Sequence, residues 1–311
     1  MNVGRSGLRV SELTLGTMSW GDTVDEMVAG EILQDFRDAG GSTIDTAYGY
    51  ADGAAEEIIG RLIKHSDRDQ LVLVGKAGIS RTTGSRVVDT SRGTLLNQLD
   101  ASLHRLGTDH LDLWLVHTWA DDVPLAETMS ALEHAVTTGR ARYVGVSNYN
   151  GWQLVAASAV LREARISLVA NEIEYSLVER SADVELLPAA GHVGAGLLAW
   201  APLGGGVLTG KYRRGVPADS RAASGRHTGW AARRLGGASD SIVDAVATAA
   251  DGLGVSPAQV ALGWARTRPG ISSLIVGVRN RTQLRTVVGG ADTTLPPAIA
   301  QALDDVSARS N

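Results

Sequence analysis

The chain has 311 residues, of which 44% are hydrophobic and 20% are charged, and it contains no cysteine. This balance is typical of a globular protein with a large core, and the lack of cysteine excludes disulfides and thiolate metal sites. The net charge of -5 gives no reason to expect a nucleic acid or an anionic membrane as partner. We find no apolar signal segment or membrane-length run, and we expect a cytoplasmic protein.

Along the chain, alternation around Ser6 and Gly7 first predicts a small β-hairpin at residues 4–11. Apolar runs then indicate strands at 13–17 and 42–45, separated by an amphipathic helix at 26–39 that ends at two glycines. A helix at 54–65 precedes the run 71–76, which ends in Lys76 and suits a parallel strand covered on both faces. A loop at 79–88 and a helix at 90–106 lead to a strand at 111–117, which ends in His117.

The same alternation continues through the second half. We expect helices at 124–138, 152–163 and 182–190, and strands at 143–148, 167–172 and 196–200. A long irregular segment, 201–237, follows this seventh strand. Helices at 240–252 and 256–266, a last strand at 272–277, and helices at 282–289 and 296–308 complete the chain. Eight strands that alternate with helices predict an α/β fold of the (β/α)8 TIM-barrel type, with one domain over residues 1–311.

Polar or aromatic residues follow each predicted strand. The C-terminal ends of parallel strands meet at one rim of such a barrel, and that rim carries the chemistry, so we expect these side chains to share a site. They are Thr17, Asp45, Lys76, His117, Ser147 with Asn148, Glu172, Trp200 and Arg279.

An aspartate, a lysine, a histidine and a nearby tyrosine suggest proton transfer to or from an oxygen. A free phenol has a pKa of about 10, and the ammonium of Lys76 would lower it, so that a tyrosine could act as general acid. Asp45 would keep Lys76 charged and oriented, and His117 would bind a carbonyl oxygen or relay a proton. On these residues alone, Tyr50 and Tyr48 both remain candidates for the acid.

The long segment after the seventh strand opens with glycines and is rich in cations. Residues 204–211 have the G-x-x-x-x-G-K spacing of a P-loop, but Tyr212 replaces the Ser or Thr that would reach Mg²⁺, and this argues against nucleotide hydrolysis. The glycine amides could instead bind a phosphate, or the loop could simply be flexible. The cations, which either receive phosphates or form a solvated face, are Lys211, Arg213, Arg214, Arg221, Arg226, Arg233 and Arg234. The histidines lack metal-ligand spacing, so we expect no metal.

Four stretches, taken in order and context, resemble the aldo-keto reductase superfamily, and the resemblance covers nearly the whole chain. They are Asp45-Thr46-Ala47 followed by Tyr50; Leu111-Asp112-Leu113 leading to His117; Gly139-Arg140 with Val144 to Asn148; and Pro202-Leu203-Gly204 through Leu208-Thr209-Gly210-Lys211-Tyr212. The resemblance implies an NADPH-dependent carbonyl reductase on a barrel without a Rossmann domain.

The resemblance also implies roles for individual residues. The family's catalytic tetrad falls on Asp45, Tyr50, Lys76 and His117, which favours Tyr50 over Tyr48. The residues expected to bind NADPH or NADP⁺ are Thr17, Met18, Asp45, Ser147, Asn148, Glu172, Trp200, Ala201, Pro202, Leu203, Gly204, Gly206, Leu208, Lys211, Gly277, Arg279 and Gln283. An aromatic entrance for the substrate, next to Tyr50 and His117, has Trp20, Trp119, Trp230 and Met18 as candidates, with simple packing as the alternative.

Two positions depart from the family pattern. Glu172 stands where a glutamine usually contacts the nicotinamide carboxamide, and an ionised Glu cannot donate a hydrogen bond to it. Val287 replaces an asparagine that usually binds adenine. Arg279 is kept, and it favours NADPH because a guanidinium can bind the 2′-phosphate.

We therefore expect reduction of a small-molecule aldehyde or ketone, in which Tyr50 protonates the oxygen. Two alternatives remain. A sugar-nucleotide ketoreductase of secondary metabolism would use the basic segment to bind a diphosphate. A cofactor-sensing regulatory subunit, like the potassium-channel β subunits of the same superfamily, would keep the barrel but serve a partner; the lack of an evident docking segment favours the enzyme.

Overall fold

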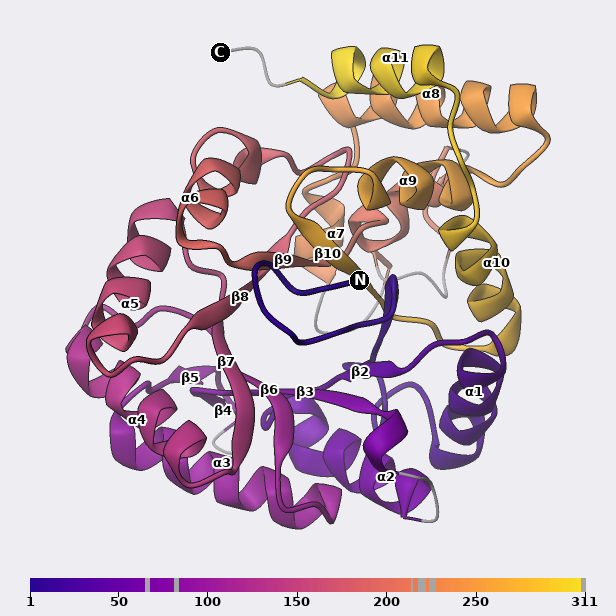
Figure 1. Cartoon of the computed structure of the whole chain (residues 1–311). Helices are drawn as coiled ribbons and strands as arrows, with labels where there is room; N and C mark the ends of the chain where they lie inside the picture. Colours follow the sequence, from indigo (N-terminus) through magenta and orange to yellow (C-terminus); the bar gives the residue numbers. More distant parts are fainter. Residues whose placement is uncertain (65–67, 81–83, 214, 218–221, 224–227, 309–311) are drawn as a thin grey trace.

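The computed structural model describes residues 1–64, 68–80, 84–213, 215–217, 222–223 and 228–308. Eight parallel strands close into a barrel in the order β1-β10-β9-β8-β7-β6-β3-β2, and helices surround it (Figure 1). The predicted (β/α)8 TIM barrel is confirmed, and the long segment does follow the seventh barrel strand, β9.

The barrel strands begin and end within two residues of the predicted bounds. They are β1 (Leu13–Gly16), β2 (Thr43–Asp45), β3 (Val72–Ala77), β6 (Leu111–Val116), β7 (Ala141–Ser147), β8 (Leu168–Glu174), β9 (Gly196–Trp200) and β10 (Ile271–Val276). The helices are α1 (Glu26–Asp38), α2 (Ala54–Ile63), α3 (Arg92–Leu106), α4 (Leu125–Thr137), α5 (Gly151–Glu163), α6 (Leu186–Val193), α7 (Thr228–Ala232), α8 (Ala238–Leu253), α9 (Pro257–Arg266), α10 (Arg281–Ala291) and α11 (Pro297–Ser307). Short 3-10 turns are η1 (Tyr50–Gly53), η2 (Arg68–Gln70), η3 (Ser181–Asp183) and η4 (Gly204–Thr209).

The N-terminal segment closes one end of the barrel. Its side chains Val3, Leu8 and Val10 are at most 5% exposed and pack in one cluster with strand residues that include Leu113 and Leu198. Burial of each such side chain contributes roughly 1.5–3 kcal/mol, which fixes the segment across the strands' N-terminal ends. Figure 1 looks onto this end, where the indigo segment crosses the barrel.

Strand register brings the polar strand ends to the opposite rim. Gly16 of β1 pairs with Asp45 of β2, and Ser147 of β7 pairs with Glu172 of β8. Because the strands are parallel and nearly in step, side chains from distant parts of the sequence meet there.

Three segments differ from the prediction in detail. The N-terminal hairpin is reduced to a single antiparallel bridge between Asn2 and Arg9. The expected loop at 79–88 contains a small antiparallel pair, β4 (Ile79–Ser80) and β5 (Val87–Val88). The segment 201–237 is not wholly irregular, because it includes η4 and α7. Elements of two to six residues are too short to show a sequence period, so pattern analysis does not find them.

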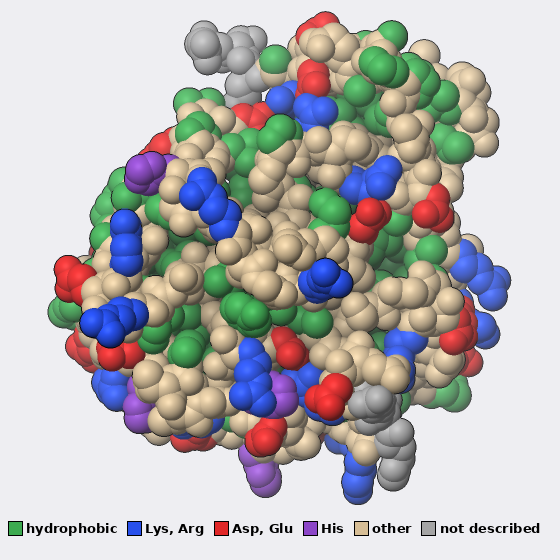
Figure 2. Space-filling view, viewed as in Figure 1, with side chains coloured by type: hydrophobic (Ala, Val, Ile, Leu, Met, Phe, Trp, Pro, Cys, Tyr) green, Lys and Arg blue, Asp and Glu red, His purple; other side chains and the backbone are tan. Residues whose placement is uncertain are grey.

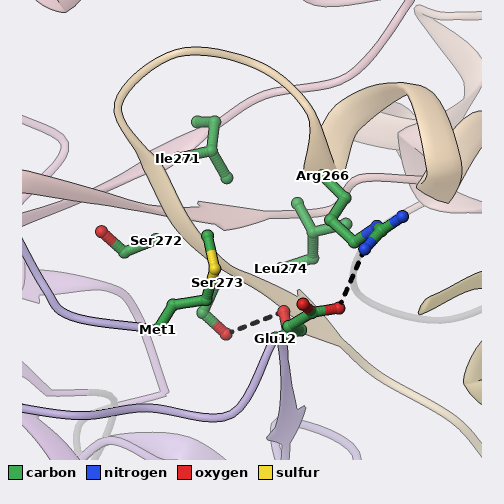
Figure 3. A pocket seen from close by; sticks show the side chains of 7 residues that line it. All are labelled: Met1, Glu12, Arg266, Ile271, Ser272, Ser273 and Leu274. Carbon is green, nitrogen blue, oxygen red and sulfur yellow. Dashed lines mark hydrogen bonds and ion pairs between the residues drawn. The ribbon is translucent and has the colours of Figure 1, made fainter. Parts of the chain in front are cut away.

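The end of the barrel closed by the N-terminal segment has a mixed surface. Acidic, basic and apolar side chains are interspersed on this face (Figure 2). A small pocket there is lined by Met1, Glu12, Arg266, Ile271, Ser272, Ser273 and Leu274 (Figure 3). Its polar groups pair with one another, since Arg266 contacts the Glu12 carboxylate at 3.2 Å.

Neither a membrane span nor a metal cluster is found within the described residues. There, no helix has the length and apolar character needed to cross a bilayer. In the same part of the chain, no three His, Asp or Glu side chains are grouped so that they could hold a metal ion.

Candidate active site

Lys76 is buried at the rim between two carboxylates. Its Nζ lies 3.1 Å from Glu172 Oε2 and forms a shorter ion pair with Asp45. The side-chain exposures are 0% for Lys76, 3% for Asp45 and 4% for Glu172. The three groups come from strands β3, β2 and β8, and together they form a water-excluded cluster of one cation and two carboxyls.

Burial and charge act against each other in this cluster. Burial disfavours the Lys76 ammonium, but the charges of Asp45 and Glu172 outweigh this effect and raise the pKa of Lys76. Burial also raises the pKa of Asp45, and burial together with the charge of Asp45 raises the pKa of Glu172 to about 8, although Lys76 opposes both shifts. Lys76 therefore stays charged, and both carboxyls hold a proton more strongly than exposed carboxyls do.

This arrangement changes the interpretation of Glu172. The family resemblance implied that it contacts the nicotinamide carboxamide, yet in the structure its carboxyl contacts the catalytic lysine candidate, Lys76. The sequence held one signal of this contact: a carboxyl replaces an amide at a strand end beside a predicted Asp–Lys pair.

Tyr50 lies directly beside the cluster. Lys76 Nζ is 5.4 Å from the centroid of the Tyr50 ring, and the ring of His117 meets Tyr50 edge-on at 5.9 Å between centroids. Burial raises the pKa of the Tyr50 phenol above its ordinary value; Lys76 lowers it, whereas Asp45 and Glu172 raise it further. The expected net lowering of this pKa is therefore wrong, because lost hydration and two carboxylates outweigh one ammonium.

The turn that presents Tyr50 has a left-handed backbone. In η1, Ala51 has φ 48° and Asp52 has φ 55°, and Gly53 follows with φ 102°. Such a conformation costs a non-glycine residue roughly 1–2 kcal/mol. Contacts from outside the turn are therefore needed to hold Tyr50 in place.

Arg105 of α3 supplies several of those contacts. Its guanidinium donates to the Tyr48 carbonyl at 3.3 Å, lies 4.7 Å from the Tyr48 ring centroid, and pairs at 3.0 Å with the fully buried Glu56 of α2. An added Cβ at Gly53 would lie 2.5 Å from the same guanidinium, and φ 102° also favours glycine there. Sequence analysis missed Arg105 and Glu56, because nothing in their spacing connects them to Tyr50.

The two tyrosines have different neighbours. The Tyr48 ring stacks on Arg105, whereas the Tyr50 ring faces Lys76 and His117. This geometry supports Tyr50 as the residue that exchanges a proton.

Asn148 connects the histidine to the aromatic residue across the rim. Its Nδ2 donates to the His117 carbonyl and to Ser147 Oγ, both at 3.0 Å, and its Oδ1 accepts from Trp200 Nε1 at 3.1 Å. Asn148 has φ 59°, a conformation that Asn tolerates better than most residues. The indole of Trp200 is thus oriented beside an amide and a hydroxyl.

Trp230 covers part of this region. Its ring packs beside Trp200 at 5.8 Å between centroids, and its Nε1 donates to Glu174 Oε2 at 3.2 Å. Glu174 also pairs with Arg234. The Trp230–Glu174 hydrogen bond and the ion pair hold the end of the long segment against β8.

The cations of the long segment are not a free phosphate-binding set. Arg234 is paired with Glu174, and Arg213 with Asp244 at 3.0 Å. The sequence also included Arg214, Arg221 and Arg226 in this set, and these three lie outside the described residues. Ion pairing weakens the case for a diphosphate site made from the whole set.

The glycine-rich stretch forms a compact turn. Within η4, Gly205 and Gly206 have φ 71° and 96°, and Leu208 is fully buried. The amides of Gly204 and Gly206 donate to the carbonyls of Ala201 and Leu203, so both amides are hydrogen-bonded within the turn. Ala201, at φ 52°, and the buried Pro202 lead into this turn from β9.

Lys211 folds back over the turn. A Cβ at Gly206 would lie 2.8 Å from Lys211 Nζ, and the same Nζ lies 5.0 Å from the Tyr212 ring centroid. Lys211 is exposed, so its ammonium can meet an anion from solvent.

The residues after β10 form the start of α10. The Arg279 amide donates to Gln283 Oε1 at 2.8 Å, and Asn280 caps the helix by accepting from the Gln283 amide. Gly277 is exposed between β10 and this turn. Gln283 therefore shapes the turn that carries Arg279. Val287, on the same helix, is 4% exposed and belongs to the core.

The proposed substrate entrance is only partly supported. Trp20 is fully buried, which argues against the entrance role expected for it. Trp119 meets Tyr149 and Trp152 edge-on, each at 5.2 Å between centroids. Trp152 is 57% exposed and was not identified from the sequence, although it follows Asn148 closely in the chain.

Thr17 and Met18 differ in their surroundings. Thr17 is fully buried, and its hydroxyl donates to the Asp45 carbonyl at 2.9 Å, so it supports the strand end that carries Asp45. Met18 is half-buried in the loop after β1.

A barrel whose C-terminal rim buries a lysine against carboxylates and a tyrosine, beside an oriented indole, belongs to the class of barrel oxidoreductases. The chain is a member of the Aldo/keto reductase family, whose model matches residues 12–308.

Several curated relatives match over nearly their full length. The chain is 35% identical to the uncharacterized oxidoreductase YrpG of Bacillus subtilis, over 98% of this chain and 94% of the relative. It is 34% identical to a probable voltage-gated potassium channel subunit beta of Oryza sativa, over 99% and 95%. It is 35% identical to L-glyceraldehyde 3-phosphate reductase of Escherichia coli, over 90% and 84%.

Proposed function

We propose that this protein is an NADPH-dependent reductase of aldehydes or ketones in which Tyr50 donates the proton. The observation that carries the proposal is the contact of the buried Lys76 with Asp45 on one side and the Tyr50 ring, at 5.4 Å, on the other. A lysine held charged next to a phenol is an arrangement suited to moving a proton. Burying that charge costs stability, and a core that only had to pack would not need a charged group there.

The four proposed catalytic residues have distinct tasks. Tyr50 carries the proton on its phenolic oxygen and releases it as the substrate oxygen gains negative charge. Lys76 favours that release, and Asp45 keeps Lys76 charged and in place. His117, whose ring lies against Tyr50, binds the carbonyl oxygen. Burial of Lys76, Asp45 and Glu172 keeps water from screening the charges that act on Tyr50.

The rim residues fit a nicotinamide cofactor. The indole of Trp200 offers a flat face for stacking and is fixed by its hydrogen bond to Asn148. The Ser147 hydroxyl can donate to a carboxamide, and Asn148 Oδ1 can accept a second hydrogen bond. Lys211 and Arg279 supply positive charge for phosphates. When bound, the cofactor supplies the hydride.

The test is NADPH consumption with a panel of aldehydes, ketones, sugar nucleotides and phosphorylated aldehydes, with Tyr50→Phe as the matched control. Phosphorylated aldehydes are included because one relative is named for such a substrate. We expect turnover of at least one carbonyl class, and a loss of roughly 10²-fold or more in Tyr50→Phe. Unchanged turnover in Tyr50→Phe would show that Tyr50 does not donate the proton.

A cofactor-sensing regulatory subunit is the second candidate. It is favoured by the relatives named as potassium channel β subunits, which match this chain over 98% to 99% of its length. NADPH binding without turnover of any carbonyl in the panel would support this candidate over the reductase. The sugar-nucleotide ketoreductase is the weaker alternative, because Arg213 and Arg234 of the basic segment are already paired.

A further inference from the structure

Glu172 brings to the catalytic cluster a carboxyl that the proposed reaction does not require. Asp45 alone would balance the charge of Lys76. With Glu172 also ionised, the cluster would carry a net negative charge at side-chain exposures of 0% to 4%. An uncompensated buried charge is costly, so the cluster favours keeping one proton on its carboxyls. Hydrogen bonding between the two carboxyls raises the pKa of Glu172 and lowers that of Asp45.

Titratable groups on several elements face Glu172 or its direct partners. Among the described residues they are Asp45 on β2, Lys76 on β3, Tyr50 on η1 and His117 after β6. Lys76 contacts Asp45 more closely than Glu172, so Glu172 is the carboxyl that keeps the proton. Its ionisation would add a second negative charge beside Lys76, within the electrostatic reach of Tyr50.

We propose that Glu172 is a positioning residue that shares the Lys76 ammonium with Asp45 and sets, through its own charge, the pH range in which Tyr50 exchanges its proton. The proposal rests on the reductase function above and deepens it. With Glu172 neutral, the cluster is the simple Asp45–Lys76 pair. With Glu172 ionised, the added charge makes the Tyr50 phenol hold its proton more tightly.

The first experiment measures the proton on Glu172 without any turnover. Infrared difference spectra between the wild type and Glu172→Gln, taken from about pH 5 to pH 10, report the carbonyl stretch of a protonated carboxyl. We expect this band near neutral pH and its loss in the mildly alkaline range. Glu172→Asp should shift the band, and it assigns the band if the Gln variant does not fold. A Glu172 that is ionised throughout the range would overturn the proposal.

The second experiment measures the pH profile of kcat/KM for carbonyl reduction. Without the Glu172 charge, the alkaline limb of the profile should move to lower pH by roughly one unit or more in Glu172→Gln. Glu174→Gln is the matched control, because Glu174 is a partly buried carboxyl on the same strand that pairs with Arg234 and not with Lys76. An unmoved limb in Glu172→Gln, or an equal shift in both variants, contradicts the proposal.

The two experiments separate this inference from the function on which it rests. If the wild type reduces no carbonyl compound, the reductase function fails, and the infrared titration still decides whether Glu172 holds a proton. If the enzyme is active but the profile of Glu172→Gln is unmoved, only the role of Glu172 fails.

Discussion

Lys76 Nζ lies 5.4 Å from the centroid of the Tyr50 ring, so the buried ammonium faces the ring of the proposed proton donor. The contact is made inside the protein, where Lys76 has no exposed side-chain surface and burial raises the pKa of Tyr50. Tyr50 therefore keeps its proton over the neutral range. In the proposed reaction, Lys76 favours release of this proton, and no phenolate has to be present beforehand.

The first prediction tests which tyrosine is the acid. Tyr50→Phe should bind NADPH normally and lose roughly 10²-fold or more of kcat, because the general acid is removed. Tyr48→Phe should keep most of its activity, since its ring stacks on Arg105 and its carbonyl, not its hydroxyl, accepts the Arg105 hydrogen bond. Steady-state kinetics and fluorescence titration with NADPH provide the two measurements. An inactive Tyr48→Phe beside a normal Tyr50→Phe would reverse the assignment.

The second prediction concerns the support of the catalytic turn. Arg105→Ala should lower the free energy of unfolding by about 2 kcal/mol or more, because it leaves the carboxylate of Glu56 buried without its cation. It should also lower kcat, since the left-handed turn after Tyr50 loses its outside contact. Denaturant unfolding and kinetics measure both effects. In Glu56→Gln, which leaves no buried carboxylate and keeps a neutral partner for Arg105, both losses should be smaller; equal losses would show that the unpaired Glu56 carboxylate is not the cause.

The third prediction concerns stability and pH. The pKa of Glu172 rises from its ordinary value of 4.5 to about 8 on folding, so the folded protein holds a proton that the unfolded chain has released between these values. The contribution of Glu172 is therefore fully present below the unfolded pKa and is lost as pH rises through the folded one. The slope is at most about 1.4 kcal/mol per pH unit for one proton. Denaturant unfolding from about pH 5 to pH 9 should show this loss in the wild type, and less of it in Glu172→Gln.

The architecture and the grouping of polar residues at one rim were predictable from the sequence, and the reason is physical. Strand apolarity, helix periodicity and chain order define a barrel, and a barrel brings residues at strand ends to one rim. Asp45, Lys76 and Glu172 illustrate this, since each was identified from its place at a strand end. The contact between Glu172 and Lys76 had only an indirect signal, the carboxyl in place of an amide, because the contact itself depends on which way two rim side chains turn.

Other features depend on tertiary contacts that have no local signal. Arg105 reaches the Tyr50 turn through the Tyr48 carbonyl, 57 positions away in sequence, and through Glu56, 49 positions away. Trp20 has the aromatic side chain expected of an entrance residue, but it is fully buried. The net direction of the Tyr50 pKa depends on the balance between burial and three charges, and sequence analysis considered only one of them, Lys76.

The fourth prediction concerns cofactor choice. Arg279→Ala should raise the Kd for NADPH much more than the Kd for NADH, because only NADPH carries the 2′-phosphate. A charged contact of this kind is worth roughly 1.5–3 kcal/mol. Titrations of both cofactors with the wild type and the variant measure the difference. Arg281→Ala is the matched control: Arg281 lies two residues further on and is paired with Asp35 at 2.7 Å. Equal weakening of both cofactors by Arg279→Ala would show that Arg279 does not contact the phosphate.

The last prediction concerns the stretch from Leu203 to Tyr212. It contains three consecutive glycines at positive φ and a lysine folded over the last of them, which suits a turn that adjusts to an anion. The opposing view is a turn fixed by packing, because Leu208 is fully buried and the amides of Gly204 and Gly206 are already bonded. Those internal bonds limit the change we expect to the backbone around Lys211 and the remaining amides.

Amide hydrogen exchange with and without NADP⁺ separates these two views. We expect slower exchange within residues 203–212 when NADP⁺ is bound, mainly around Lys211 and at the amides not bonded within the turn. The effect should be smaller in Lys211→Ala, which removes the cation but keeps the glycines. Arg213→Ala is the control, because Arg213 is exposed and paired with Asp244. Exchange that does not change at saturating NADP⁺ would mean that the turn is held by packing alone, and that neither its glycines nor Lys211 serves the cofactor.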